Sequence, residues 1–272
     1  MANTVYDNFY LSNEVEDLFK SHLDLFPFCQ ADDTLEGTAG MKRIINVYTA
    51  TEGTEKLAVT QGNTKSIEVG FSKKEYEIAL AQNRFIYYDE QAMRDPNVVP
   101  VGLQQMATDM FNTVNKDIFA EFNRTTQTVA GSGKVFDDFI DAVATLNVDG
   151  TDNDPAKLSL FGFVSPKTMA IVRKGLGDQL KYVESFARTG YVGTVGGVPL
   201  YVKKDAKDGD VVIATPKAVT VFVKKGTEVE PKRDPNTREN AIFSRKYYIA
   251  ALTNKTQAVK ITGLKLPTAT GI

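Results

Sequence analysis

A long amphipathic stretch runs from Val101 to Gln127. Its apolar side chains recur at intervals of three and four residues, which places them on one face of an α-helix. They are Leu103, Met106, Ala107, Met110, Phe111, Val114, Ile118 and Phe122. Pro100 suits the first turn of such a helix, where its missing N–H costs nothing, and the polar face carries Gln104, Asp109, Asn112, Asn115 and Lys116. The pattern predicts a core helix packed on a sheet, with Phe111 buried against residues 240–252.

Composition excludes several classes of protein. The 272 residues include 32 Lys and Arg against 34 Asp and Glu, so no overall field attracts nucleic acid or an anionic membrane. The single cysteine, Cys29, excludes an intrachain disulfide framework and a multi-cysteine metal site, as expected for a reducing cytoplasm. No basic signal region opens the sequence, and no apolar run approaches the roughly 20 residues that span a bilayer. We expect a soluble, unexported protein of one large or two ordinary domains.

The first 40 residues predict an arm. A short helix is expected from Ser12 to Lys20, with Asn13 as its cap and Glu16 completing a capping box. The stretch that follows is polar and marked by glycine, so the arm has no core of its own and needs another surface to lie on.

Residues 41–72 predict a long two-stranded ribbon. Residues 42–50 go out, and residues 64–71 return with Ile67, Val69 and Phe71 alternating against polar or small neighbours. Because an isolated ribbon is only marginally stable in water, this one must pack on the same chain or on a neighbour.

After Gly131-Ser132-Gly133, helical and strand-like segments alternate. Helices are expected at 136–147 and at 165–176, where Ser165 can cap and Pro166 can occupy the first position. Strands are expected at 157–164 and 193–202. Strand-like segments at 210–225, 240–252 and 257–263, joined through residues 226–239, are expected to return to the sheet under the long helix.

This order of parts resembles the major capsid proteins of tailed bacteriophages, of the Hong Kong 97 type. The stretches that carry the resemblance are FGFVSPKTMAIVRK, VGTVGGVPLYV and the closing residues 229–263. The resemblance covers nearly the whole chain and implies an α+β, Hong Kong 97-like capsid fold. Its parts would be an N-terminal arm (1–40), an extended loop (41–72), a peripheral domain with the long spine helix (73–133 and 223–272) and an inserted axial α/β domain (134–222).

The resemblance also implies a function. The chain would be the major capsid protein of a tailed bacteriophage, self-assembling through pentamers and hexamers into an icosahedral shell around double-stranded DNA. It would need no catalysis, metal or cofactor, would reside in the virion, and would assemble in the bacterial host cytoplasm. Because the chain lacks the coiled-coil leader of some members, a separate scaffolding protein is expected, together with a portal and decoration proteins. Encapsulin-type nanocompartment shells share the fold and are the alternative, although they typically open with a cargo-binding helix.

Charged residues in the loop and near the end of the chain are candidate contacts between subunits. They are Lys56, Lys65, Arg233, Asp234, Arg238 and Arg245. Acids are interleaved with these bases, which favours partners on neighbouring subunits or a solvated surface over a DNA site. Some members of the family join an extended-loop lysine to an asparagine of a neighbour, here Lys56 or Lys65 with Asn236 or Asn240. We expect ordinary noncovalent contacts instead.

A rival interpretation is a small α/β enzyme. Its pocket would lie at a strand end of the middle domain, with Asp137, Asp138 or Asp141 as the acid or base. The only histidine, His22, has no second imidazole to share a metal, and Cys29 beside Phe26 and Phe28 indicates packing.

Two further patterns indicate turns. Asp149, Asp152 and Asp154 lack the spacing and the closing glutamate of a calcium loop. The glycines at 190, 193, 196 and 197 match neither a dinucleotide fingerprint nor a P-loop, so we expect them in strands and turns.

Overall fold

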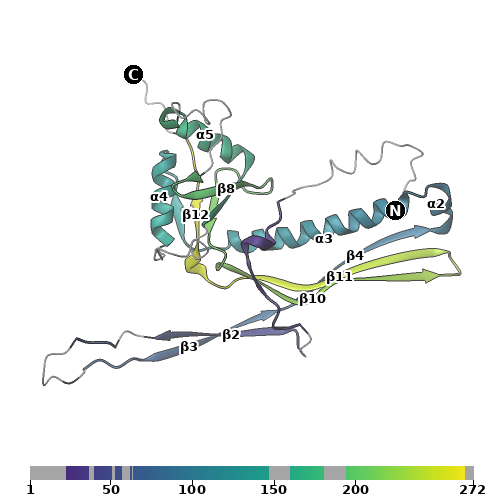
Figure 1. Ribbon diagram of the computed structural model, residues 1–272, viewed down its shortest axis with the longest axis horizontal. Coiled ribbons are helices and arrows are strands. Elements are labelled where there is room, and N and C mark those ends of the chain that lie inside the picture. Colours follow the sequence, from purple (N-terminus) through teal and green to yellow (C-terminus); the bar gives the residue numbers. More distant parts are fainter. Residues whose placement is uncertain are drawn as a thin grey trace.

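The computed structural model describes residues 23–36, 40–50, 53–56, 62, 64–146, 160–180 and 194–266. One long helix, α3, lies along a four-stranded sheet, and a two-stranded hairpin, β2–β3, projects away from that body (Figure 1). A six-stranded sheet with helices α4 and α5 forms a separate α/β unit at one end of α3 (Figure 1). The predicted helix 12–20, His22, the acids at 149, 152 and 154, and the glycines at 190 and 193 lie outside the described residues.

Helix α3 spans Val98–Asn123, and Pro100 lies in its first turn as predicted. Its 26 residues correspond to a length of about 39 Å. It ends four residues before the predicted Gln127, because the chain must turn there to enter strand β5 (Thr128–Ala130). A short helix, α2 (Asp89–Arg94), precedes it.

The buried face of α3 differs from the predicted one. Met106, Met110, Val114, Ile118 and Phe122 are buried as expected, but Phe111 is 38% exposed and Leu103 is 40% exposed. Asn115, assigned to the polar face, is only 2% exposed, and its Oδ1 accepts a 2.9 Å hydrogen bond from the Leu25 N–H. Phe111 and Asn115 lie one turn apart on the same ridge. The N-terminal segment covers this ridge at Asn115 and leaves it open at Phe111, so the predicted burial of Phe111 was wrong.

The four-stranded sheet has the order β1-β10-β11-β4. Strand β1 is parallel to β10, and the other pairs are antiparallel. The bounds are Gln30–Asp32 for β1, Ala79–Tyr88 for β4, Val219–Asp234 for β10 and Glu239–Leu252 for β11. Residues 226–234, expected to be a connector, instead continue β10, because they pair with β11 in regular register once past a bulge between Val223 and Glu228.

Glycine allows α3 to approach this sheet closely. Gly102 is buried, and a Cβ on it would clash with the ring of Phe85 on β4. A larger side chain would therefore displace either the Phe85 ring or the N-terminal half of α3.

The six-stranded sheet has the order β5-β12-β9-β6-β8-β7. Its remaining strands are β6 (Phe161–Val164), β7 (Thr194–Val195), β8 (Val198–Val202), β9 (Val211–Ala214) and β12 (Ala258–Thr262), and its helices are α4 (Val135–Leu146) and α5 (Pro166–Leu180). Strand β12 was expected under α3 but pairs with β5 and β9 instead. This sheet therefore takes strands from both sides of the middle segment 134–222, whose domain boundaries remain a prediction.

Local sequence signals in this unit are confirmed. Ser165 caps α5, since its Oγ accepts a 3.1 Å hydrogen bond from the Thr168 N–H. Gly196 and Gly197 have φ values of 56° and 80° and form the two-residue turn between β7 and β8, a conformation that favours glycine at both positions.

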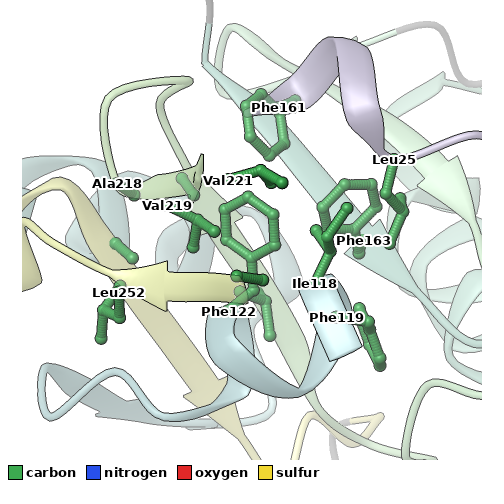
Figure 2. Close-up of a cluster of buried hydrophobic side chains, with 14 of the residues drawn as sticks. Leu25, Ile118, Phe119, Phe122, Phe161, Phe163, Ala218, Val219, Val221 and Leu252 are labelled. Carbon is green, nitrogen blue, oxygen red and sulfur yellow. The ribbon is translucent and has the colours of Figure 1, made fainter. Parts of the chain in front are cut away.

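The end of α3 joins both sheets in one core. Figure 2 shows Ile118, Phe119 and Phe122 of α3 meeting Phe161 and Phe163 of β6, with Val219 and Val221 of β10 beside them. The Phe122 ring centroid lies 5.7 Å from that of Phe161 and 5.6 Å from that of Phe163. This aromatic cluster fixes the α/β unit to the helix.

The described part of the N-terminal arm belongs to the same core. Leu25 is fully buried there, and Phe28 of the 3₁₀ turn η1 (Phe26–Phe28) packs edge-on to Phe161 at 4.9 Å. Strand β1 then adds to the sheet edge. Residues 23–36 of the predicted arm therefore lie on a surface of their own chain.

Candidate assembly surfaces

The projecting hairpin is held to the body through one face of its base. Strands β2 (Lys42–Ala50) and β3 (Val69–Glu77) pair from Lys42↔Glu77 to Ala50↔Val69, so the return strand extends beyond its predicted end at Phe71. The Tyr76 ring stacks on Phe222 at 5.5 Å, and the Lys74 ammonium donates a 3.4 Å hydrogen bond to the Thr253 carbonyl. These contacts fix where the hairpin leaves the molecule.

The opposite face of the hairpin carries an exposed apolar row, here called the hairpin stripe. Val69 and Phe71 are each 65% exposed, and Ile44 and Ile67 are also exposed. Ile44 pairs with Glu75, so it shares a face with Phe71 and Val69. Four large apolar side chains on a ribbon without a core beneath them form a surface suited to burial against another molecule.

The loop lysines predicted as contacts lie toward the far end of the hairpin. Lys56 and Lys65 are both exposed. Each lysine follows a residue of a hydrogen-bonded pair, since the Glu55 carboxylate accepts hydrogen bonds from the Thr64 N–H at 3.0 Å and from the Thr64 hydroxyl at 2.9 Å. This pair draws the two lysine-bearing segments together.

The tip of the β10–β11 hairpin forms a charged cluster with α2, here called the tip cluster. The Asp89 carboxylate accepts hydrogen bonds from Asn240 Nδ2 at 2.6 Å and from the Arg233 guanidinium at 2.9 Å. These donors, Asn240 first, lower the pKa of Asp89. Arg238, which has a φ of 57°, pairs with Glu90 at 2.9 Å.

The other two predicted contact residues also have partners within the chain. Asp234 accepts a 2.9 Å hydrogen bond from the Asn236 N–H, which is the main cause of its lowered pKa. Arg245 pairs with Glu230 across β10 and β11 at 2.6 Å. Arg233, Asp234, Arg238 and Arg245 thus stabilise one hairpin and its corner, and any role between subunits would be additional to these bonds.

Sequence reasoning missed a groove beside α3, here called the α3 groove. Its volume is about 440 Å³. One wall is the α3 ridge of Leu103, Ala107 and Phe111 with its buried neighbours, and the other includes Thr227 and Val229 of β10 and Ser244 and Lys246 of β11. Asp24, Phe26 and Asn115 also line it. The spacing of Leu103, Ala107 and Phe111 could have predicted this groove, because these residues make the apolar face of the helix wider than one sheet can cover.

Burial, hydrogen bonds and an ion pair give several of the candidate catalytic residues a structural role. Burial raises the pKa of the Cys29 thiol to about 12, so it is protonated at neutral pH and a poor nucleophile. Asp138 is buried and accepts hydrogen bonds from the Ser132 N–H at 2.9 Å and hydroxyl at 2.6 Å, whereas Asp137 pairs with Lys134 at 3.7 Å on the surface. Asp138 thus anchors the start of α4, and this arrangement gives the enzyme interpretation no support.

Within the described ranges, no group of three or more His, Cys, Asp and Glu residues is arranged to hold a metal ion. Among the same residues, no helix combines the length and apolar character needed to cross a membrane.

Comparison with known proteins gives matches by structure and none by sequence. No protein-family model and no curated protein sequence matches the chain. The mature capsid of bacteriophage PhiM1 matches with a TM-score of 0.69 at 12% identity, over 98% of this chain and 90% of that one. The capsid of the native GTA particle matches with a TM-score of 0.67 at 11% identity, over 95% and 100%. Mycobacterium phage Che8 gives 0.64 at 16% identity, over 85% and 88%.

A virus-like particle from Pyrococcus furiosus also matches, with a TM-score of 0.53 at 14% identity over 92% of this chain and 95% of that one. These matches run over most of the length of both chains. The chain therefore has the Hong Kong 97-like capsid fold that its sequence resembles.

Proposed function

We propose that this chain is the major capsid protein of a tailed bacteriophage and that it assembles with copies of itself into the shell of the virion. The observation that carries this proposal is the hairpin stripe, an apolar face that the chain's own core leaves uncovered. Exposed apolar surface of this kind marks an interaction site, and a shell subunit would bury it against a neighbour. End-to-end likeness to phage capsid subunits supports the same conclusion.

The finer parts of this function follow from the resemblance and belong to the proposal. Pentamers and hexamers would close an icosahedral shell around double-stranded DNA, with a separate scaffolding protein, a portal and decoration proteins as partners. Assembly would take place in the bacterial cytoplasm. The division into arm, extended loop, peripheral domain and axial domain, and the contacts of Lys56 and Lys65 with neighbours, are proposed on the same basis.

Size-exclusion chromatography of the purified full-length chain tests the proposal. A shell subunit should elute as megadalton particles or as loose capsomers. Elution solely as a monomer or small oligomer, across a range of concentrations and salt, would contradict it.

The encapsulin-type alternative follows from the resemblance, since such shells share the fold. The virus-like particle from Pyrococcus furiosus matches with a lower TM-score than the capsid of phage PhiM1. The contents of particles isolated from their natural source distinguish the two functions. Phage heads should contain double-stranded DNA, whereas a nanocompartment should contain protein cargo.

A further inference from the structure

We propose that the α3 groove is the docking site for the first 22 residues of the same chain. This inference concerns the single subunit and does not depend on the proposed shell. It commits to the chain's own N-terminal segment, with a neighbouring copy as the outcome that would overturn it.

The described N-terminal segment covers the apolar ridge of the groove at one end only. Leu103, Ala107, Phe111 and Asn115 follow one another at four-residue intervals, so they form a single ridge along α3. Leu25 covers this ridge at Asn115, where its N–H donates to the Asn115 side chain. Beyond that point Phe111 and Leu103 are exposed, so the covering stops where the described N-terminal segment stops.

The chain enters the groove at the correct end. Asp24 and Phe26 line it, and Leu23 packs against the core beside them. The preceding residue is therefore joined directly to the wall of the groove. Since residues 23–36 already pack on their own chain, docking of the preceding segment would continue an established intrachain interface.

A buried donor also lacks a partner at this site. Asn115 is nearly fully buried, and its Nδ2 has no hydrogen-bond partner among the described residues, although its Oδ1 is bonded to Leu25. Buried amide groups are normally satisfied. A backbone carbonyl of the arriving segment would supply the missing acceptor.

The sequence of the segment suits the groove. Leu11, Val15, Leu18 and Phe19 have the spacing i, i+4, i+7 and i+8, which predicts one apolar face of a helix of the kind that binds in a groove. From residue 11 to 19 such a helix would be about 12 Å long, within the roughly 18 Å of α3 between Leu103 and Asn115.

Charge is complementary as well. Residues 1–22 contain four acids and one lysine. The groove contains Lys246, whose ammonium lies 5.8 Å from the centre of the Phe26 ring. An acidic segment with an apolar face therefore matches an apolar groove with a basic residue at its rim.

Photo-crosslinking of the full-length chain tests this docking. A p-benzoylphenylalanine in place of Phe19 should crosslink, on irradiation, to residues 103–114 of α3 or to Val229. The same photo-residue in place of Asp17, on the opposite face of the predicted helix, should give about tenfold less of these products, since it would point to solvent. Equal yields from both positions, or no crosslink to the groove, would overturn the proposal.

Isotope labelling separates the chain's own segment from that of a neighbour. Dissociated chains in light and heavy forms are mixed before irradiation, and crosslinked peptides are analysed by mass spectrometry. Docking within one chain gives products that are wholly light or wholly heavy. Mixed products in statistical proportion would assign the groove to a second copy and overturn the proposal.

A groove variant provides an independent check. Val229→Asp places a charge in the wall at an exposed position, so it should preserve the melting temperature and reduce the Phe19-position crosslink about tenfold. Lys232→Asp, on the same strand outside the groove, should leave the yield unchanged. An unchanged yield in Val229→Asp would contradict the docking.

Discussion

The phenol of Tyr248 on β11 donates a 2.7 Å hydrogen bond to Asp117 Oδ2 on α3. Tyr248 is buried and belongs to the core cluster, whereas Asp117 lies at its exposed margin. This bond is one specific link between the long helix and the sheet beneath it. Burial raises the pKa of the Tyr248 phenol far above its usual value, and hydrogen bonding to Asp117 with its nearby charge raises it further.

Replacing Tyr248 by Phe should remove this bond and lower the free energy of unfolding by about 1 kcal/mol, because the Asp117 carboxylate can still be hydrated. Urea denaturation of unassembled protein at about pH 8 measures the difference. Identical midpoints for the two proteins would show that the bond does not contribute to stability.

The same pair predicts a pH dependence. The folded-state pKa of Tyr248 is raised, so its proton is held in both states at neutral pH and is lost first from the unfolded chain as pH rises above about 10. The contribution of the Tyr248 phenol to the free energy of unfolding is therefore fully present below that pH. It declines as the pH rises toward the folded-state pKa. The stability advantage of the native chain over Tyr248→Phe should shrink between about pH 8 and pH 11 in urea titrations. A constant or growing advantage would contradict the assignment.

Truncation of Phe122 should lower the free energy of unfolding much more than truncation of Phe111. Phe122 is fully buried between the two sheets, whereas Phe111 is exposed along the groove. Phe122→Ala should cost about 3–5 kcal/mol, since it removes transfer free energy and leaves a cavity, and Phe111→Ala should cost about 1 kcal/mol or less. Thermal melts of unassembled protein decide, and a larger loss for Phe111→Ala would mean that the helix face is assigned wrongly.

Asn115 and Asn112 offer a matched pair of polar truncations on α3. Asn115→Ala would leave the buried Leu25 N–H without its acceptor and should cost about 1–3 kcal/mol. Asn112, only partly buried, should tolerate alanine within about 0.5 kcal/mol. Chemical denaturation of both variants measures the costs. Equal values would show that the N-terminal segment is not held through Asn115.

Local features of this fold could be predicted from sequence because neighbouring residues determine them. The Ser165 cap, the Gly196-Gly197 turn and the start of α3 near Pro100 depend on residues within a few positions. The sheet membership of β12 could not be predicted in this way. Its partners β5 and β9 are far away in sequence, and its pattern alone suited either sheet.

The candidate surfaces show the same limit. The stretch 226–234 has the composition of a loop, yet pairing with β11 makes it strand. The alternation of Ile67, Val69 and Phe71 correctly predicted a ribbon, but which face lies on the body depends on the contact between Tyr76 and Phe222. The burial of Asn115 likewise depends on Leu25, 90 residues earlier in the chain.

The hairpin stripe should control assembly and leave the subunit fold intact. Val69 and Phe71 are largely exposed in the single chain, so the double variant Val69→Ser, Phe71→Ser should melt within a few degrees of the native subunit. Without apolar surface to bury, it should remain as small species in sedimentation velocity. Glu68→Ser, in the same segment and also exposed, is the control. Normal assembly of the double variant would show that assembly does not need the hairpin stripe.

Electron microscopy of the purified, full-length chain under assembly conditions tests whether it is a shell subunit. If the chain is a shell subunit, the images should contain round, closed particles of uniform diameter. Images that show solely small discrete oligomers, from protein with the native melting temperature, would contradict a role as a shell subunit.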